Sequence, residues 1–282
     1  MHEWPLIIFT LLIQGSVGIT VFTTFTLIYA NGSLDGAEKC RLARPSMLVV
    51  FIAGALGLIA STTHLGYPLN AFHALTHFES SWLSREIIFA SLYLAVLGVA
   101  TLIAIFSKRV WPILLVLASL LGIVDVFCMS AIYFHSSVVT WMHFNTYLMF
   151  YGSALSLGAV ACLWSLAARP DLSALLVKRV AVTAVILVVV TTLLRLLAQP
   201  LYMAFLAHAG NGEAVTFPHQ PLIAFEQLST VRTASWVILT AGAGALALSL
   251  RSHRTNKKML ALGSALVVVA EVSLRFSFFS IN

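Results

Sequence analysis

The chain reads WPILLVLASLLGIVDVFCMSA from Trp111 to Ala131, and Asp125 is the one charged residue in this stretch. A helix of about 20 mostly apolar residues is long enough to cross the hydrocarbon layer of a membrane. Pro112 suits the first turn of such a helix, where its missing N–H costs least. The basic pair Lys108 and Arg109 lies in the connection just before the run. The stretch therefore predicts a membrane-spanning helix with a basic connection at its start.

The rest of the sequence repeats this pattern of apolar runs and short polar connections. Of the 282 residues, 60% are hydrophobic and 9% are charged, and the mean hydropathy is +0.97, which no water-soluble protein surface tolerates. We therefore expect an all-α polytopic membrane protein with one transmembrane domain over residues 1–282. Its eight expected spans are Pro5–Ile28, Pro45–Thr63, Ser84–Phe106, Trp111–Ala131, Met142–Ala168, Arg179–Tyr202, Leu228–Leu250 and Met259–Phe279. The first run lacks the positive start of a secretory signal, so it is expected to be retained as a span.

Basic residues gather in alternate connections between these runs. Twelve of the 16 lie in the first, third, fifth and seventh connections, and none lies clear of the spans in the other three. Because cytoplasmic loops carry the excess of Lys and Arg, both termini are expected on the outer, non-cytoplasmic side of the membrane, which is the periplasmic side if the membrane is a bacterial inner membrane. The twelve residues are Lys39, Arg41, Arg44, Lys108, Arg109, Arg169, Lys178, Arg179, Arg251, Arg254, Lys257 and Lys258.

The charge and cysteine patterns exclude two classes of partner or cofactor site. The net charge of +6 comes from these topological clusters, so we expect membrane lipid and no nucleic acid as a partner. The cysteines Cys40, Cys128 and Cys162 stand singly, whereas an iron–sulfur cluster usually needs four thiolates. An iron–sulfur centre would therefore belong to a partner, and no metal site is expected here.

Eight charged residues fall within spans or at their outer ends. Charge in a span costs several kcal/mol unless it is paired or hydrated, and it usually marks function. Glu271 and Arg275 are four residues apart on one helix face, which favours a structural ion pair, and Asp125 and Arg195 can pair across helices. The eight are Arg85, Glu86, Asp125, Arg195, Glu226, Arg232, Glu271 and Arg275.

His64 ends the second span and Glu86 begins the third, so the connection between them can bring the two side chains together. Imidazole can bind a quinol hydroxyl oxygen while the carboxylate takes its proton. Gly66 and Tyr67 would shape the head-group pocket, and Arg85 would oppose a rise in the pKa of Glu86 caused by burial. A structural interpretation stays open as well, because His is common at span ends and Glu is favoured at helix starts.

Other uses of these residues also stay open. A haem b sandwiched between spans needs histidines at matching depth, and only His64, His135 and His143 come near. A small transporter would place its ionisable residues near the membrane midplane, whereas here they cluster on one side. A short interfacial helix is expected over residues 66–82, and the longest outer loop is expected at Met203–Gln227.

The chain resembles the DmsC family, the membrane anchor subunits of bacterial dimethyl sulfoxide reductases. The resemblance covers nearly the whole length and is strongest at 2–10, 59–68 and 83–87, with weaker echoes at Thr140-Trp141, Leu228 with Arg232, and Glu271 with Arg275. The sequence departs from the family at Arg85, where Asn is common, and in the sixth span with the loop after it.

The resemblance implies a haem-free, eight-span subunit of the bacterial inner membrane. Such a subunit oxidises menaquinol and passes electrons to a four-cluster iron–sulfur subunit, which feeds a molybdopterin catalytic subunit. The family's quinol-site histidine and glutamate match His64 and Glu86. Arg232, Glu271 and Arg275 are then structural residues or part of a proton path.

Overall fold

A computed structural model describes residues 4–62, 77–210, 216–251 and 255–281. All the regular elements in these ranges are helices, which confirms the all-α expectation. Eight of the helices are long and apolar enough to cross a membrane. These eight are α1 (Trp4–Tyr29), α2 (Gly36–Thr62), α4 (Trp82–Phe106), α5 (Pro112–Phe134), α6 (Asn145–Ala167), α7 (Ala174–Gly210), α9 (Ser229–Ser249) and α10 (Lys257–Phe279). The short elements are the 3-10 helix η3 (Val139–Trp141) and α8 (Pro221–Gln227).

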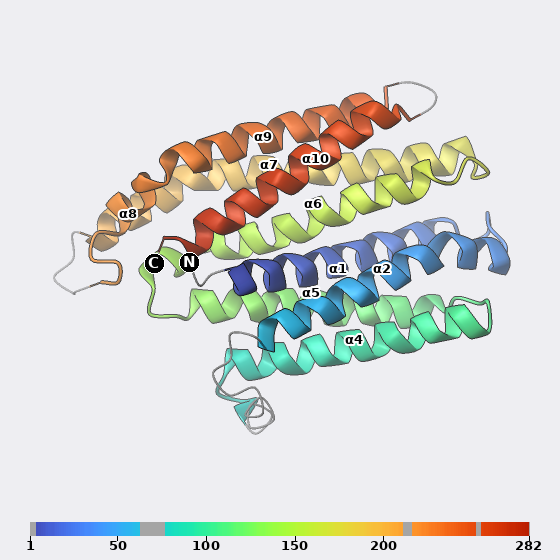
Figure 1. The fold of residues 1–282 in the computed structure, drawn as a ribbon, viewed down its shortest axis with the longest axis horizontal. Coiled ribbons are helices and arrows are strands. Elements are labelled where there is room, and N and C mark those ends of the chain that lie inside the picture. Colours follow the sequence, from blue (N-terminus) through green and yellow to red (C-terminus); the bar gives the residue numbers. More distant parts are fainter. Residues whose placement is uncertain (1–3, 63–76, 211–215, 252–254, 282) are drawn as a thin grey trace.

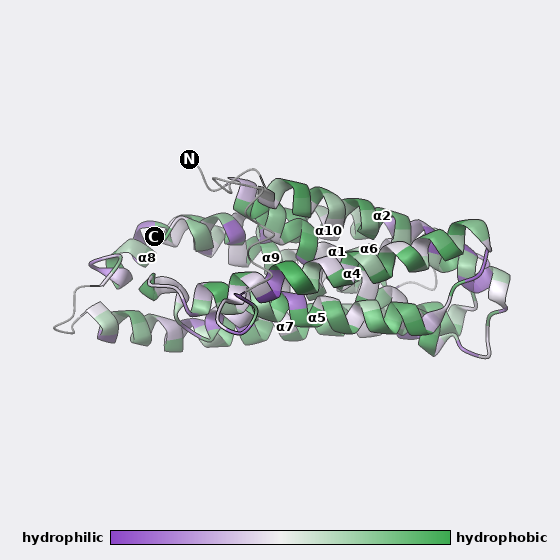
Figure 2. Cartoon of the chain, turned by 90° about the horizontal axis from the view of Figure 1, so that it is seen from below, coloured by the Kyte–Doolittle hydropathy of each residue, from purple (hydrophilic) through white to green (hydrophobic). Residues whose placement is uncertain are grey.

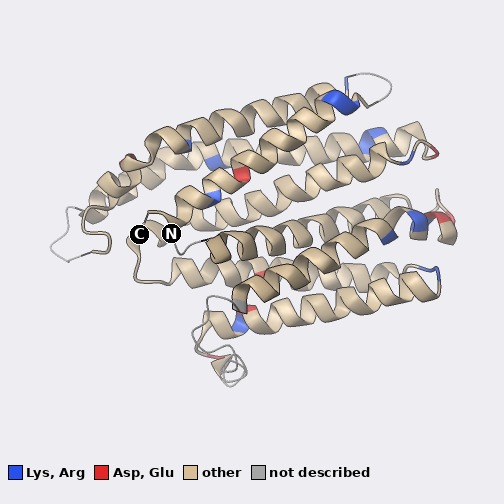
Figure 3. Ribbon diagram, viewed as in Figure 1, with Lys and Arg blue, Asp and Glu red and all other residues tan. Residues whose placement is uncertain are grey.

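The long helices run side by side as one bundle (Figure 1). Helix α1 begins and α10 ends at the same end of the bundle, which we call the terminal end. The connections α1–α2, α4–α5, α6–α7 and α9–α10 lie at the opposite end. Figure 3 shows Lys and Arg gathered there, so we call it the basic end. The alternation of basic connections in the sequence therefore corresponds to two distinct ends of the bundle.

The outer surface of the bundle carries many large apolar side chains. Figure 2 shows hydrophobic residues along the helices over most of their length. Ile113 and Leu197 are 69% and 71% exposed, respectively. Water would penalise such a surface, whereas lipid tails would not. The helices therefore suit a bundle surrounded by lipid.

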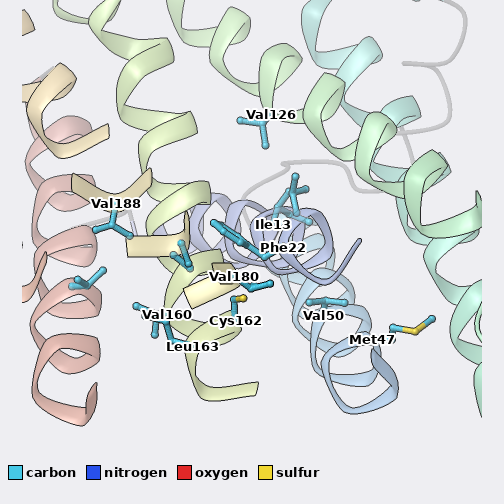
Figure 4. Packing of buried hydrophobic residues seen from close by; sticks show 14 of the residues in the cluster. Ile13, Phe22, Met47, Val50, Val126, Val160, Cys162, Leu163, Val180 and Val188 are labelled. Atoms are coloured by element: carbon cyan, nitrogen blue, oxygen red, sulfur yellow. The ribbon is translucent and has the colours of Figure 1, made fainter. Parts of the chain in front are cut away.

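Helix α1 lies at the centre and packs against α2, α5, α6 and α10. Its Ile13 and Phe22 belong to a core that includes Val50 of α2 and Val160 of α6 (Figure 4). Two glycines, Gly18 and Gly158, bring α1 and α6 into backbone contact. A Cβ added to Gly18 would lie 1.8 Å from the carbonyl oxygen of Ala154. Small residues thus set the closest helix–helix approach, as is common in membranes.

Two predicted boundaries are wrong, each for a local reason. The second helix begins at Gly36, well before Pro45, because Asp35 and Glu38 form a capping box. The Glu38 N–H donates to Asp35 Oδ1 at 2.7 Å, and the Asp35 N–H donates to Glu38 Oε2 at 2.9 Å. Pro45 consequently lies inside the helix.

The expected outer loop at Met203–Gln227 is also wrong. Helix α7 continues through Pro200 as far as Gly210, and Pro221 opens α8 at its first turn. Residues 211–215 between them lie outside the described ranges. Of the interfacial helix expected over 66–82, residues 66–76 lie outside the described ranges, and a turn occupies 77–80.

Candidate functional site

Glu86 lies in the second turn of α4, close to the terminal end. The helix starts at Trp82 because the Ser81 hydroxyl caps it and accepts a hydrogen bond from the Ser84 N–H at 3.3 Å. Glu86 is 5% exposed, and its Oε1 has no hydrogen-bond partner among the described residues. A buried carboxyl group without such a partner is costly. Position and burial therefore mark Glu86 as a functional candidate.

Arg85, the neighbouring site candidate, points away from this carboxyl group. Its Nε and Nη2 donate to the carbonyls of Phe78 and Glu79 at 3.0 and 2.6 Å. Its guanidinium lies 4.2 Å from the ring centre of Trp82. Among the described residues it forms no ion pair with Glu86. Arg85 therefore holds the turn before α4 in place, and its influence on the pKa of Glu86 stays a prediction.

Asp125 on α5 is a second buried carboxyl group at this site. It is fully buried, and neither carboxyl oxygen has a hydrogen-bond partner in the described part of the protein. Helices α4 and α5, which carry Glu86 and Asp125, pack against each other. The expected pairing of Asp125 with Arg195 is wrong, because Arg195 binds Glu271. The site thus contains two neighbouring carboxyl groups.

Aromatic rings flank the start of α4. The Trp82 ring stacks on His135 with 5.5 Å between ring centres and 4° between planes, and it meets the edge of Phe127 at 5.8 Å. Together with Arg85, these residues form a stacked layer of guanidinium, indole and imidazole. Glu86 therefore sits beside flat groups that suit a ring-shaped head group.

Three predicted site residues, His64, Gly66 and Tyr67, lie outside the described residues. The approach of His64 to Glu86 therefore stays a prediction. The other two histidines considered for haem do not face each other. His135 stacks on Trp82, whereas His143 packs against Tyr202 and Phe205 with ring-centre distances of 5.3 and 5.0 Å.

A second polar cluster lies buried between α1, α6, α7 and α10. Arg195 donates to both carboxylate oxygens of Glu271, at 2.7 and 3.1 Å, and the Ser153 hydroxyl donates to Glu271 Oε2 at 2.7 Å. Arg275 Nη2 donates to Gln14 Oε1 at 2.6 Å and to Ser153 Oγ at 3.0 Å. The ion pair expected between Glu271 and Arg275 is not formed, since Arg195 takes the carboxylate. This cluster fixes helices to one another.

Arg232 also makes local contacts at the terminal end of the bundle. Its Nη1 donates to the carbonyl oxygen of Phe225 at 2.5 Å, and its guanidinium lies 3.3 Å from the centre of the Phe225 ring. These contacts hold α8 against the start of α9. The contacts of Arg232 are therefore structural, and its alternative role in a proton path stays a prediction.

The described residues contain no group of three or more His, Cys, Asp or Glu that could hold a metal ion. Cys40, Cys128 and Cys162 are buried on three different helices, α2, α5 and α6.

Three curated proteins are similar to part of this sequence. An Escherichia coli K12 protein, the YnfH chain of anaerobic dimethyl sulfoxide reductase, is 34% identical over 165 residues, which is 56% of both proteins. The C chains of anaerobic dimethyl sulfoxide reductase from Haemophilus influenzae and from E. coli K12 are 32% and 34% identical, over 54% and 53% of both proteins. The matched region thus spans about half the length of these curated relatives. The family model described as DMSO reductase anchor subunit (DmsC) matches residues 1–281, so the protein belongs to this family.

Proposed function

We propose that this subunit anchors a dimethyl sulfoxide reductase-type complex in the membrane and oxidises menaquinol at Glu86. The electrons pass to a four-cluster iron–sulfur subunit and then to a molybdopterin catalytic subunit. The observation that carries this proposal is the buried carboxyl group of Glu86 near the terminal end, with a free Oε1 among the described residues and stacked rings beside it.

The chemistry of a quinol explains why a carboxylate is needed there. Oxidation of a quinol to a quinone releases two electrons and two protons. Glu86 acts as the general base that removes a hydroxyl proton, while His64 binds a hydroxyl oxygen of the head group. Gly66 and Tyr67 shape the pocket around that ring. The long apolar tail of the quinol extends into lipid, which surrounds the bundle.

Asp125 supplies a second proton acceptor at the same site. When Glu86 has taken the first proton, Asp125 can accept this proton while it releases its own toward the aqueous phase, so Glu86 becomes a carboxylate again before the second proton leaves the quinol. Two interacting carboxyl groups titrate as a pair, so the pair can hold a proton between the two steps. Both protons then leave for the aqueous phase at the terminal end, and the carboxyl groups return to their starting state.

The electrons must leave this subunit through its partners. The three cysteines are single and lie on separate helices, so they offer no thiolate set that would hold a cluster. An iron–sulfur subunit docked at the terminal end would receive the electrons next to the quinol site. The terminal end then faces the periplasm, and the basic end faces the cytoplasm.

The test replaces Glu86 by Gln in the assembled complex. Glutamine keeps the size of the side chain but accepts no proton at neutral pH. Menaquinol-driven reduction should fall by roughly 10²-fold, as expected for a lost general base. Reduction driven by an artificial donor that feeds the partner subunits directly should stay unchanged. The matched control is Glu226→Gln, an exposed carboxylate at the same end of the bundle. Native menaquinol turnover in Glu86→Gln would refute the proposed site.

A further inference from the structure

A groove runs along the membrane-facing side of the bundle between α7 and α9, near the basic end. It is shallow and open to the surroundings, with a volume of about 600 Å³. Val182, Val185 and Ile186 of α7 line one side, and Gly244 and Ala247 of α9 line the other. Every one of these residues is apolar or small, and Val185 at 7% exposure forms part of the floor. The groove therefore suits a hydrocarbon tail.

Gly244 keeps the groove open. A Cβ built on Gly244 would have no heavy atom within 4 Å, whereas one on Gly242 or Gly263 would lie about 3 Å from the neighbouring helix. Those two glycines allow α9 and α10 to pack closely, whereas no other helix lies close to Gly244. Glycine within a helix costs about 1 kcal/mol relative to alanine. The space that Gly244 leaves free is thus not explained by helix packing.

The guanidinium of Arg251 places a positive charge at one end of the groove. Arg251, just after α9, lines its end at the basic side of the bundle. The ion pairs among the described residues are Arg169–Asp171 and Arg195–Glu271, so none of them neutralises Arg251. The Asn256 N–H donates to the Ser249 carbonyl at 2.9 Å, which brings the exposed Lys257 and Lys258 to the same end. An apolar groove thus ends at a cationic rim.

We propose that this groove binds an anionic phospholipid, with one acyl tail between α7 and α9 and the phosphate at Arg251. The apolar walls match the acyl tail, and the guanidinium matches the charge of the head group. The basic end is the one that the distribution of Lys and Arg assigns to the cytoplasm, where anionic lipids attract basic residues. The site lies on different helices from Glu86 and does not depend on quinol chemistry.

The experiment measures lipids retained by the complex purified in mild detergent. The complex is incubated with equal amounts of phosphatidylglycerol and phosphatidylethanolamine, and bound lipid per complex is counted by native mass spectrometry. The unmodified complex should retain phosphatidylglycerol in preference. Arg251→Gln should lower that preference about fivefold, since one basic residue near a membrane surface contributes about 1 kcal/mol. Gly244→Leu fills the groove and should abolish retention of the lipid.

One control variant and the choice of the test variants make the experiment specific for the groove. Arg109→Gln removes a basic residue from another connection at the same end, and it should retain phosphatidylglycerol normally. Arg251→Gln leaves the helices untouched, so it tests the site even if Gly244→Leu lowers the yield of complex. Equal retention of both lipids by the unmodified complex would overturn the proposal. Unchanged retention of phosphatidylglycerol in both Arg251→Gln and Gly244→Leu would also overturn it. Retention of menaquinone in the groove instead of a phospholipid would overturn it as well.

Discussion

At the scale of single residues, Glu86 and Asp125 are both buried but lie at different distances from the terminal end of the bundle. Glu86 is next to the terminal end and within reach of a head group that enters there. Asp125 lies deeper along α5 and is fully buried. A quinol would therefore meet Glu86 first, and Asp125 would exchange protons through it.

We predict that Asp125→Asn slows quinol-driven reduction without affecting assembly. Asparagine has nearly the same size as aspartate but takes up no proton, so Glu86 would have to release each proton to water before accepting the next. The rate should fall by between about 10-fold and 10²-fold, which approaches the effect of a lost proton acceptor. Activity with an artificial donor should be normal. Asp171→Asn, at the basic end, serves as the control. If Asp125→Asn turns over menaquinol normally while Glu86→Gln fails, Glu86 works alone.

The choice of Glu86 from the sequence stays a prediction, whereas the predicted partners of the other buried charges were wrong. Glu271 and Arg275 share a helix face, so their spacing favoured an ion pair. The partner of Glu271 depends on how α7 lies relative to α10. Arg195 of α7 donates to both carboxylate oxygens of Glu271. Spacing along one helix carries no information about such contacts.

At the scale of elements, glycine decides how closely α1 and α6 approach. We predict that Gly18→Ala destabilises the folded protein by at least about 1–3 kcal/mol, because the added methyl group meets the backbone of α6, which cannot rotate away. The midpoint of thermal unfolding in detergent should fall. The matched control is Gly244→Ala, where the methyl group meets open space and the midpoint should be equal or higher. Equal midpoints for the two variants would contradict the close packing of α1 and α6.

Hydropathy predicted where the helices cross the membrane but not where they begin and end. The run starting at Pro45 marked the apolar part of α2, whereas the helix starts earlier at the polar capping box of Asp35 and Glu38. Helix α7 likewise continues beyond the predicted end of its span at Tyr202, since Tyr202 and Leu206 pack against Phe225 of α8. Caps and tertiary contacts set helix ends, and neither depends on hydropathy.

At the scale of the whole molecule, the cluster of Arg195, Glu271, Ser153 and Arg275 joins helices that are distant in sequence. We predict that Glu271→Gln destabilises the bundle by about 3–5 kcal/mol, because the guanidinium of Arg195 would remain buried without its partner. The amount of folded protein in membranes should drop, and artificial-donor activity should drop in proportion. In Glu86→Gln, by contrast, the complex should assemble fully. A normal yield of Glu271→Gln would show that the cluster does not hold the bundle together.

The subunit is a multi-pass protein of the inner membrane, and its eight candidate spans return the last helix to the end where the first begins. Since the basic residues gather at the other end, we predict a periplasmic C-terminus. Reporter proteins fused at Arg109 and Lys257 should indicate a cytoplasmic location. A reporter fused at Asn282 should indicate a periplasmic location. The test is sensitive to the number of spans, because one missed or one false span would place the two termini on opposite sides of the membrane. A cytoplasmic reporter signal at Asn282 would therefore overturn the arrangement, together with the periplasmic placement of Glu86 and the cytoplasmic placement of Arg251.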